Sequence, residues 1–284
     1  MQKFRLMTGL AIGALIAGLT FQASSALAKE PIKLPQQFES RKSWNVGMET
    51  NSPPMEYEDI KSGKLTGFNV ELVEAISAKL GLELKLQTMD VPSMSPALDS
   101  GRIDMIGSHF NDIPGRHRKL TFVDYLATGP VFYTTKENAA IYKEPAQLCG
   151  KALGAPEHTT YFRLIKEWGE KNCPADSQPV ILGTKGLPDT QLQIRQGRLI
   201  AGAIGAEKIN YWAEDPKNIF AAIGKPFYKQ LYGFAFTREN AELRDAVKAA
   251  LDQLASEGEY KRIIEKYKLS EQMLPEITID KGED

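Results

Sequence analysis

The side chains with the clearest chemical potential follow a short apolar segment in the first half of the chain. Ser108, His109 and Asn111 come directly after residues 103–107, which have the pattern of a buried strand. Ligands of α/β proteins usually bind beyond the carboxyl ends of such strands. These side chains could therefore form hydrogen bonds to a ligand, although His109 could instead only cap a turn.

Arg116 is the candidate for holding an anion. A planar guanidinium binds a carboxylate through two parallel hydrogen bonds, which suits a site shielded from water. Arg118 and Lys119 are close to it in the sequence, so an exposed basic run is the alternative interpretation.

Composition excludes several classes of protein. The 284 residues are 42% hydrophobic and 25% charged, which is ordinary for a globular protein and excludes a disordered or coiled-coil chain. Because 35 Lys and Arg oppose 36 Asp and Glu, we expect no binding of nucleic acid or anionic membranes through bulk charge. The sequence has no nucleophile elbow, phosphate-binding loop or metal-ligand cluster, so we expect no cofactor and no metal.

The first residues have the pattern of an export signal. Two basic residues precede an apolar stretch over 6–21, and Ala26 and Ala28 supply the small residues of a cleavage site. We expect a signal peptide over 1–28 and a mature protein in the periplasm. An uncleaved membrane anchor is the alternative, but the stretch is short for a membrane span.

Export makes the two cysteines informative. Cys149 and Cys173 are the only pair, and in an oxidising compartment an even number of cysteines indicates a disulfide. Two buried thiols are the alternative interpretation.

Strand and helix patterns alternate along the chain, which is typical of a mainly parallel α/β sheet. Residues 29–42 are expected to be an extended lead-in. The expected strands are 44–48, 82–86, 103–107, 151–155, 180–182, 199–204 and 230–236. The expected helices are 68–80, 92–100, 160–171, 190–196 and 241–267, the last interrupted at Gly258. The order of elements in 92–106 is repeated in 190–204, so we expect two lobes with a cleft between them.

The chain carries, in this order, an export signal, "SPPMEYED", "GKLTGFNVELVEAISAKLGLELKL", "SPALDSGRIDMIGS", "DIPGRHRKLTFVDY", "CGKALGAPEHTT", "QIRQGRL" and "LDQLASEGEYKRIIEKY". This set resembles the extracellular solute-binding proteins of polar amino-acid ABC importers. The resemblance implies a type II periplasmic-binding-protein fold, in which two crossover strands join the lobes. Lobe one would be 44–129 plus 232–284, and lobe two 130–231. It also implies closure around one ligand and docking on an inner-membrane permease, and we expect a monomer.

The resemblance assigns roles to the residues already singled out. Arg116 stands six residues before Phe122, as does the Arg that holds the ligand carboxylate in this family. Ser108, His109 and Asn111 match the segment that forms hydrogen bonds to the ligand.

A second matching segment begins a helix in lobe two. Thr159 and Thr160 match a Gly-Thr-Thr turn, where backbone N–H groups attract a ligand anion. Thr160 could otherwise be only an N-cap. His158 stands where the family has Gly, so it could narrow the cleft, add a polar contact or change the turn.

The sequence departs from the family at the position that recognises an amine. Gly205 aligns with the Asp that pairs with the ligand ammonium of amino-acid binders. Because an unpaired buried charge is costly, Glu207 or Glu157 could substitute for the missing carboxylate.

The apolar wall of the cleft also differs. Ser52 replaces an aromatic residue, and Val91 stands at another wall position, so the surface for stacking is reduced. Tyr161 or Tyr57 could supply a replacement, although we rather expect Tyr57 to pack in the core.

The sequence thus predicts a binding protein, not an enzyme, that captures an amino acid, a modified amino acid or an organic acid by hinge closure. The alternative is an enzyme similar to cyclohexadienyl dehydratases, with Glu157, Glu207, His109 and His158 as acid–base groups. A metal site built from both histidines and a carboxylate is a further alternative. So are a receptor that serves a sensor and an adhesin that kept only the fold.

Overall fold

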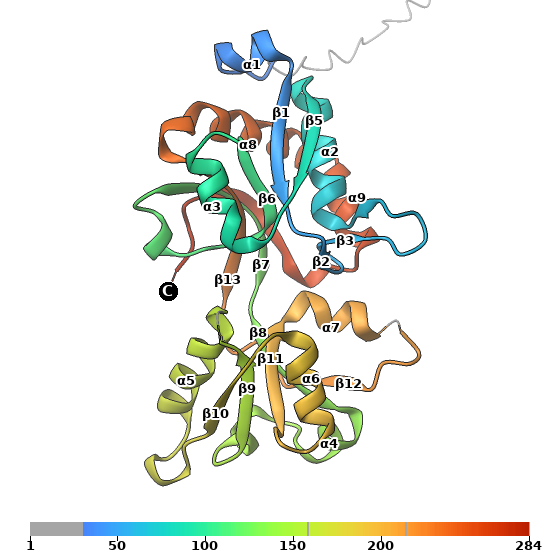
Figure 1. The fold of residues 1–284 in the computed structure, drawn as a ribbon, viewed down its shortest axis with the longest axis vertical. Helices are drawn as coiled ribbons and strands as arrows, with labels where there is room; N and C mark the ends of the chain where they lie inside the picture. The colour runs from blue at the N-terminus through green and yellow to red at the C-terminus, as the bar shows by residue number, and fades with distance from the viewer. Residues whose placement is uncertain (1–30, 158, 214, 284) are drawn as a thin grey trace, which may run out of the picture. The chain divides into compact units, whose positions relative to one another are not determined.

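The computed structural model describes residues 31–157, 159–213 and 215–283. Residues 32–284 make one compact unit, which contains two main β-sheets with helices packed against them (Figure 1). The expected signal peptide over 1–28 lies outside the described residues, as does His158. None of the described helices is long and apolar enough to cross a membrane.

A six-stranded sheet is built from both ends of the described chain. Across the sheet its strands are β14 (Met273–Ile279), β7 (Leu120–Thr128), β13 (Gln230–Thr237), β6 (Met105–Asp112), β1 (Ser43–Met48) and β5 (Glu83–Thr88). β1 runs parallel to β5 and β6, whereas β13 is antiparallel to β6 and β7. The carboxyl ends of β1 and β6 therefore lie at the same edge of the sheet.

A five-stranded sheet is built from the intervening chain. Its strands, in order, are β10 (Val180–Thr184), β9 (Ala152–Pro156), β11 (Ala201–Gly205), β8 (Pro130–Thr135) and β12 (Phe220–Ile223). The chain passes from one sheet to the other at Gly129, between β7 and β8, and returns between β12 and β13. A Cβ atom at Gly129 would collide with the carbonyl oxygen of Tyr228, so this connection requires glycine.

Helices cover both faces of the six-stranded sheet. One face packs against α2 (Phe68–Leu80), α8 (Ala241–Ser256) and α9 (Glu259–Lys266), and the other against α3 (Val91–Asp99). The apolar side chains of α2 recur at helical spacing, and Val73 and Ile76 are buried in the same apolar cluster as Trp44 and Val46 of β1. On the opposite face, Leu98 of α3 packs in a smaller apolar cluster.

The five-stranded sheet is covered in the same way. α5 (Thr160–Asn172) packs on one face, and α6 (Leu187–Arg195) and α7 (Ala206–Ala213) pack on the other. A disulfide joins Cys149, before β9, to Cys173, which ends α5. The predicted pairing of the two cysteines is confirmed.

Smaller elements complete the chain. β2 (Asn51–Ser52), β3 (Glu56–Glu58) and β4 (Leu65–Thr66) form a three-stranded sheet, and α1 (Gln36–Arg41) and α4 (Lys136–Ile141) are short helices.

The two main sheets are mixed and not mainly parallel as predicted, because β7 is paired antiparallel with β13 and β14, and β8 with β11 and β12. The structure also corrects two predictions of local structure. Residues 29–42 are not extended throughout, because α1 forms and buries Phe38 in the core. The strand expected over 103–107 continues to Asp112, because β6 pairs with β13, where Leu231 lies opposite Asp112. Ser108, His109 and Asn111 therefore belong to a strand and not to the loop after it.

Candidate ligand-binding site

A cavity of about 570 Å³ is lined by residues of both main sheets and the helices that follow their strands. The predicted site residues that line it are Ser52, Val91, Ser108, His109, Asn111, Arg116, Thr159 and Thr160. Glu157, Gly205 and Glu207 are not among the lining residues. Further lining residues, which the sequence did not single out for binding, include Glu49, Lys208 and Tyr232.

Arg116 is held in place by its own segment. It ends a turn of 3₁₀ helix over Pro114–Arg116, its Nη1 donates to the carbonyl oxygen of Asn111 at 2.6 Å, and its Cζ lies 3.7 Å from the ring centre of Phe110. Burial lowers the pKa of Arg116 to about 10, although the nearby Asp112 opposes this shift. Within the described part of the chain, no carboxylate lies within 4.0 Å of its guanidinium. The result is an oriented cation with N–H groups free to bind an anion.

Two further donors face the same cavity. The side-chain amide nitrogen of Asn111 is buried and has no hydrogen-bond partner among the described residues. Thr159 is the N-cap residue of α5, but its hydroxyl donates to the carbonyl of Pro156 at 2.8 Å instead of capping the helix. The first N–H groups of α5 therefore receive no side-chain cap, and they attract negative charge. Thr160 is the first helical residue and not the N-cap.

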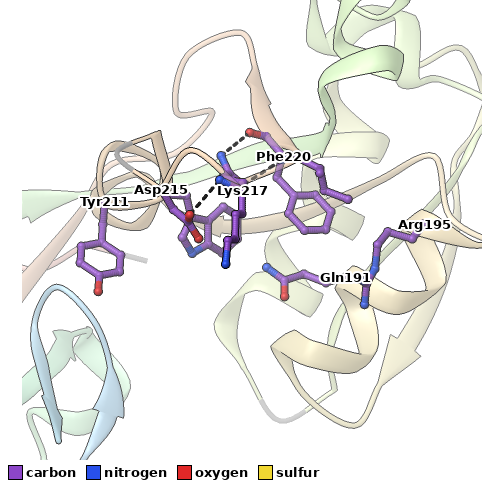
Figure 2. A pocket seen from close by; sticks show the side chains of 9 residues that line it. Gln191, Arg195, Tyr211, Asp215, Lys217 and Phe220 are labelled. Carbon is purple, nitrogen blue, oxygen red and sulfur yellow. Dashed lines mark hydrogen bonds between the residues drawn. The ribbon is translucent and has the colours of Figure 1, made fainter. Parts of the chain in front are cut away.

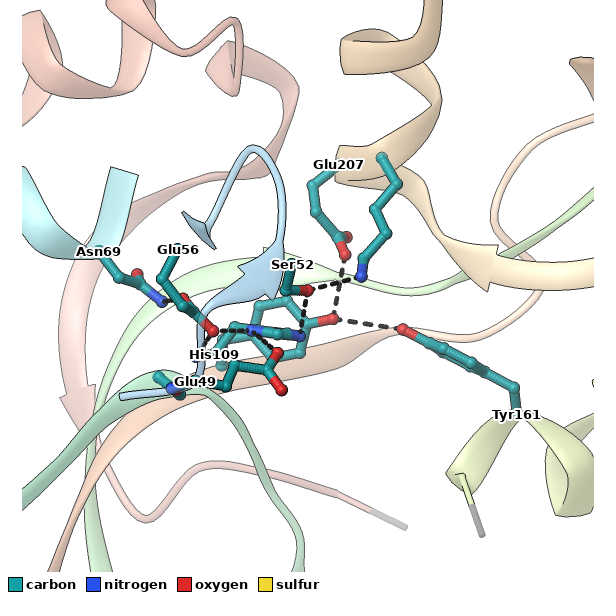
Figure 3. Close-up of polar contacts among 10 residues, drawn as sticks. Glu49, Ser52, Glu56, Asn69, His109, Tyr161 and Glu207 are labelled. Atoms are coloured by element: carbon teal, nitrogen blue, oxygen red, sulfur yellow. Dashed lines mark hydrogen bonds and ion pairs between the residues drawn. The ribbon is translucent and has the colours of Figure 1, made fainter. Parts of the chain in front are cut away.

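A network of ionisable groups lies beside the cavity (Figure 3). His109 Nδ1 is 2.5 Å from Glu56 Oε1 and 3.5 Å from Glu49 Oε1, and Asn69 donates to the other oxygen of Glu56 at 2.6 Å. Glu56 is fully buried. Burial alone would lower the pKa of His109, but the charges of Glu56 and Glu49 outweigh it and raise this pKa. The raised pKa favours the imidazolium form of His109, which Glu56 holds by a hydrogen bond.

Glu49 is the carboxylate of the network that reaches the cavity. It follows β1, and its backbone N–H donates to the Ser108 hydroxyl at 2.9 Å. Burial raises the pKa of Glu49, and the nearby positive charge of His109 partly offsets this. Ser108 thus fixes the end of β1 beside β6.

Lys208 reaches across from the five-stranded sheet to the six-stranded one. It lies in the first turn of α7, and its Nζ donates to Ser52 Oγ at 2.6 Å. Ser52 Oγ is also 3.2 Å from His109 Nε2. No ion pair within 4.0 Å joins Lys208 to a carboxylate of the described chain.

The side chain of Glu207 is buried in the protein and does not line the cavity. It is fully buried and accepts hydrogen bonds from the hydroxyls of Thr128 at 2.5 Å and Tyr232 at 3.2 Å. The hydroxyl of Tyr161, labelled in Figure 3, is 3.3 Å from the hydroxyl of Tyr232. Both tyrosines line the cavity. Gly205 is buried backbone directly before α7. At this point the cavity is lined by Tyr161 and Tyr232 and not by Glu207, one of the two carboxylates that could substitute for the missing Asp.

The other candidates lie elsewhere. Glu157 is exposed, and its side chain packs over Gly183. Tyr57 packs against the ring of Tyr211, with ring centres 6.1 Å apart. Of the two proposed replacement walls, Tyr161 lines the cavity and Tyr57 does not.

Among the residues that the structure describes, two groups of side chains bring potential metal ligands within 4.8 Å of one another: Glu49, Glu56 and His109, and Asp112, His117 and Asp280. In the first, a hydrogen bond joins His109 to Glu56. His158, the second histidine of the metal site considered from the sequence, lies outside the described residues. In the second, Asp112 accepts from His117 and from the backbone N–H of Gly282. The short distances in both groups are therefore explained by hydrogen bonds between the protein's own groups.

A different cavity, of about 580 Å³, lies beside α6, α7 and β12 (Figure 2). Its polar contacts belong to a turn, in which the Lys217 N–H donates to Asp215 and the Asn218 side chain donates to the Phe220 carbonyl. None of the predicted site residues lines it. The cavity between the two main sheets is the better candidate, because unpartnered donors converge on it.

Of the lining residues that the sequence analysis missed, one had a signal in the sequence and another had none. Glu49 follows β1 just as Ser108 follows the strand predicted over 103–107, so the strand-end argument could have found it. Lys208 had no such signal, because the sequence did not predict α7.

Comparisons with known proteins agree with this architecture. The sequence model of one protein family, the bacterial extracellular solute-binding proteins, family 3, matches residues 44–270. The chain is 28% identical over 263 residues to the L-cystine-binding protein TcyJ of Escherichia coli, covering 92% of this chain and 94% of that protein. It is 30% identical to a probable amino-acid ABC transporter-binding protein of Haemophilus influenzae, covering 93% and 96%. A solved ancestral arginine-binding protein bound to arginine is 27% identical, with a TM-score of 0.67 over 80% of this chain and 98% of that one.

Proposed function

The chain belongs to the bacterial extracellular solute-binding proteins, family 3, and we propose on that premise that it captures a small carboxylate-containing ligand for an ABC importer. The family match confirms the predicted two-lobed α/β fold. The relatives named above are binding proteins and not enzymes, so the prediction that this chain is not an enzyme is also confirmed.

The observation that carries the proposal is the convergence of three anion-binding groups on one cavity. Arg116 offers unpaired guanidinium N–H groups, Asn111 offers an unpartnered amide, and α5 offers uncapped backbone N–H groups. Asn111 lies on β6 of the six-stranded sheet and Arg116 follows this strand, whereas α5 follows β9 of the five-stranded sheet. A carboxylate bound by groups from both sheets would favour the arrangement in which the two sheets close on it.

We further propose the boundaries of the two lobes and the place where the protein acts. Lobe one would comprise 44–129 with 232–284, and lobe two 130–231, which agrees with the membership of the main strands in the two sheets. After removal of residues 1–28 the protein would act in the periplasm as a monomer and deliver its ligand to an inner-membrane permease.

Isothermal titration calorimetry on protein refolded to remove carried ligand tests the proposal. Arg116→Met should weaken binding of any carboxylate ligand about 100-fold, because a bidentate, charge-assisted pair is lost. Arg118→Met is the matched control, since Arg118 is an exposed arginine of the same segment. Equal affinities in the two variants would show that Arg116 does not bind the ligand.

A further inference from the structure

The cavity contains two cations without anionic partners, and they come from different sheets. Arg116 belongs to the segment after β6, and Lys208 to the first turn of α7. Neither lies within 4.0 Å of a carboxylate in the described ranges. An ammonium has three N–H donors, and the hydrogen bond of Lys208 Nζ to a side chain of the described residues goes to a neutral hydroxyl, Ser52 Oγ.

The acidic groups nearby do not neutralise this pair. Glu49 is the single carboxylate among the described lining residues, and it interacts with the positive charges of both His109 and Lys208. One carboxylate therefore faces more than one cation. Glu56 is fully buried behind His109. The lining therefore presents more positive than negative charge to whatever enters.

The carboxylate that could receive a ligand amine is also out of reach. Both oxygens of Glu207 accept hydrogen bonds from protein hydroxyls, and its side chain is fully buried. Lys208, the next residue, projects toward Ser52 instead. After Gly205, which aligns with an amine-recognising Asp, the charged side chain that lines the cavity is therefore the cation Lys208.

We propose that Lys208 binds a second acidic group of the ligand, so that the ligand is a small dicarboxylate held between Arg116 and Lys208. This inference rests on the proposed function, because it places the first carboxylate at Arg116. In the bound state, Lys208 exchanges its hydrogen bond to Ser52 for an ion pair with the ligand. A ligand that lacks the second negative charge would leave Lys208 without an ion-pair partner in the closed site. The protein should therefore bind a diacid much more tightly than a matched monoacid.

The test is a titration of refolded protein with matched acids. Succinate, glutarate and adipate are each compared with their own monoamide, which has the same shape and one charge fewer. Aspartate, glutamate and 2-aminoadipate show separately whether an α-amino group is tolerated. The tightest diacid should bind at least about tenfold more tightly than its monoamide, because a charge-assisted hydrogen bond is lost.

Lys208→Met should weaken binding of that diacid about 10- to 100-fold and change the affinity for the monoamide less than about threefold. Lys208→Arg should retain the preference. Lys217→Met, at an exposed lysine beside the other cavity, is the matched control and should bind like the wild type. Thermal unfolding of each variant checks that it is folded.

Two outcomes overturn the diacid inference alone. One is tighter or equal binding of a monoamide or a neutral amino acid. The other is an equal effect of Lys208→Met on every ligand, which would mean that Lys208 only bridges the sheets through Ser52. In both cases the loss of binding in Arg116→Met would still support the proposed function. If no acid of the series binds and Arg116→Met has no effect, both proposals fail.

Discussion

The carboxyl group of Glu207 fills the space that a side chain on Gly205 would need. A Cβ atom built on Gly205 would lie 2.6 Å from Glu207 Cδ and closer still to both carboxylate oxygens. The absence of a side chain at position 205 and the buried carboxylate two residues later are therefore one structural feature.

Gly205→Ala should displace the Glu207 carboxylate from its hydrogen bonds with Thr128 and Tyr232. We expect the free energy of unfolding to fall by about 2 to 4 kcal/mol, because hydrogen bonds to a buried charge are lost. Chemical denaturation measures this. Gly115→Ala is the control, since a Cβ there meets open space. If both variants are equally stable, the Glu207 carboxylate forms equally favourable hydrogen bonds elsewhere in the variant.

Asp124 should make the protein less stable as the pH rises toward neutrality. Burial, reinforced by the negative charge of Asp112, raises the pKa of Asp124 to about 7. A carboxyl group with a raised pKa binds its proton more tightly in the folded state. Its contribution to stability is therefore complete below about pH 4 and is lost as the pH rises through about 7, at most roughly 4 kcal/mol.

Asp124→Asn should remove most of this dependence. Its amide oxygen can accept from the Thr278 hydroxyl and the Lys281 N–H, as Asp124 Oδ2 does, and its NH₂ group can donate toward Asp112. We expect a higher free energy of unfolding than the wild type at pH 8 and a smaller difference at pH 4.5. Asp99→Asn, at an exposed position, should leave the pH profile unchanged. Parallel profiles for wild type and Asp124→Asn would contradict the assignment.

Glu56→Gln should destabilise the protein more at pH 6 than at pH 9. The raised pKa of His109 means that its ion pair with Glu56 contributes fully below pH 6.5 and is lost as the pH rises through the folded-state value. Removing one partner of a buried pair costs about 3 kcal/mol at pH 6. Denaturation at both pH values measures the change, and Glu58→Gln, exposed on the same strand, is the control. A loss that is independent of pH would indicate that His109 is neutral throughout.

Replacing both Cys149 and Cys173 by Ser should lower the free energy of unfolding by about 3 to 4 kcal/mol. The disulfide closes a loop with a sequence separation of 24, and its loss enlarges the conformational freedom of the unfolded chain. Denaturation in the presence and absence of reductant checks this. The wild type in reductant should approach the variant, and the variant itself should not respond to reductant.

Much of the fold could be predicted from local patterns. The helix predicted over 68–80 is α2, and the interruption predicted at Gly258 separates α8 from α9. Such elements follow from the spacing of apolar residues and from glycine at positive φ, which neighbouring residues alone determine. The family resemblance, carried by motifs in a set order, placed Arg116, Asn111 and Thr159 at one site, and all three line the cavity.

The rest depended on contacts between segments far apart in the sequence. Whether Glu207 faces the ligand or the protein depends on Thr128 and Tyr232, which lie on two strands of the other sheet. Lys208 reaches the cavity only because Ser52, 156 residues away, is brought within hydrogen-bonding distance. The sequence by itself therefore determined many of the elements and the family, and it singled out Arg116 as the candidate for binding a carboxylate. Only the tertiary structure decided which charges face the ligand, because the direction of a side chain depends on the packing of both sheets around it.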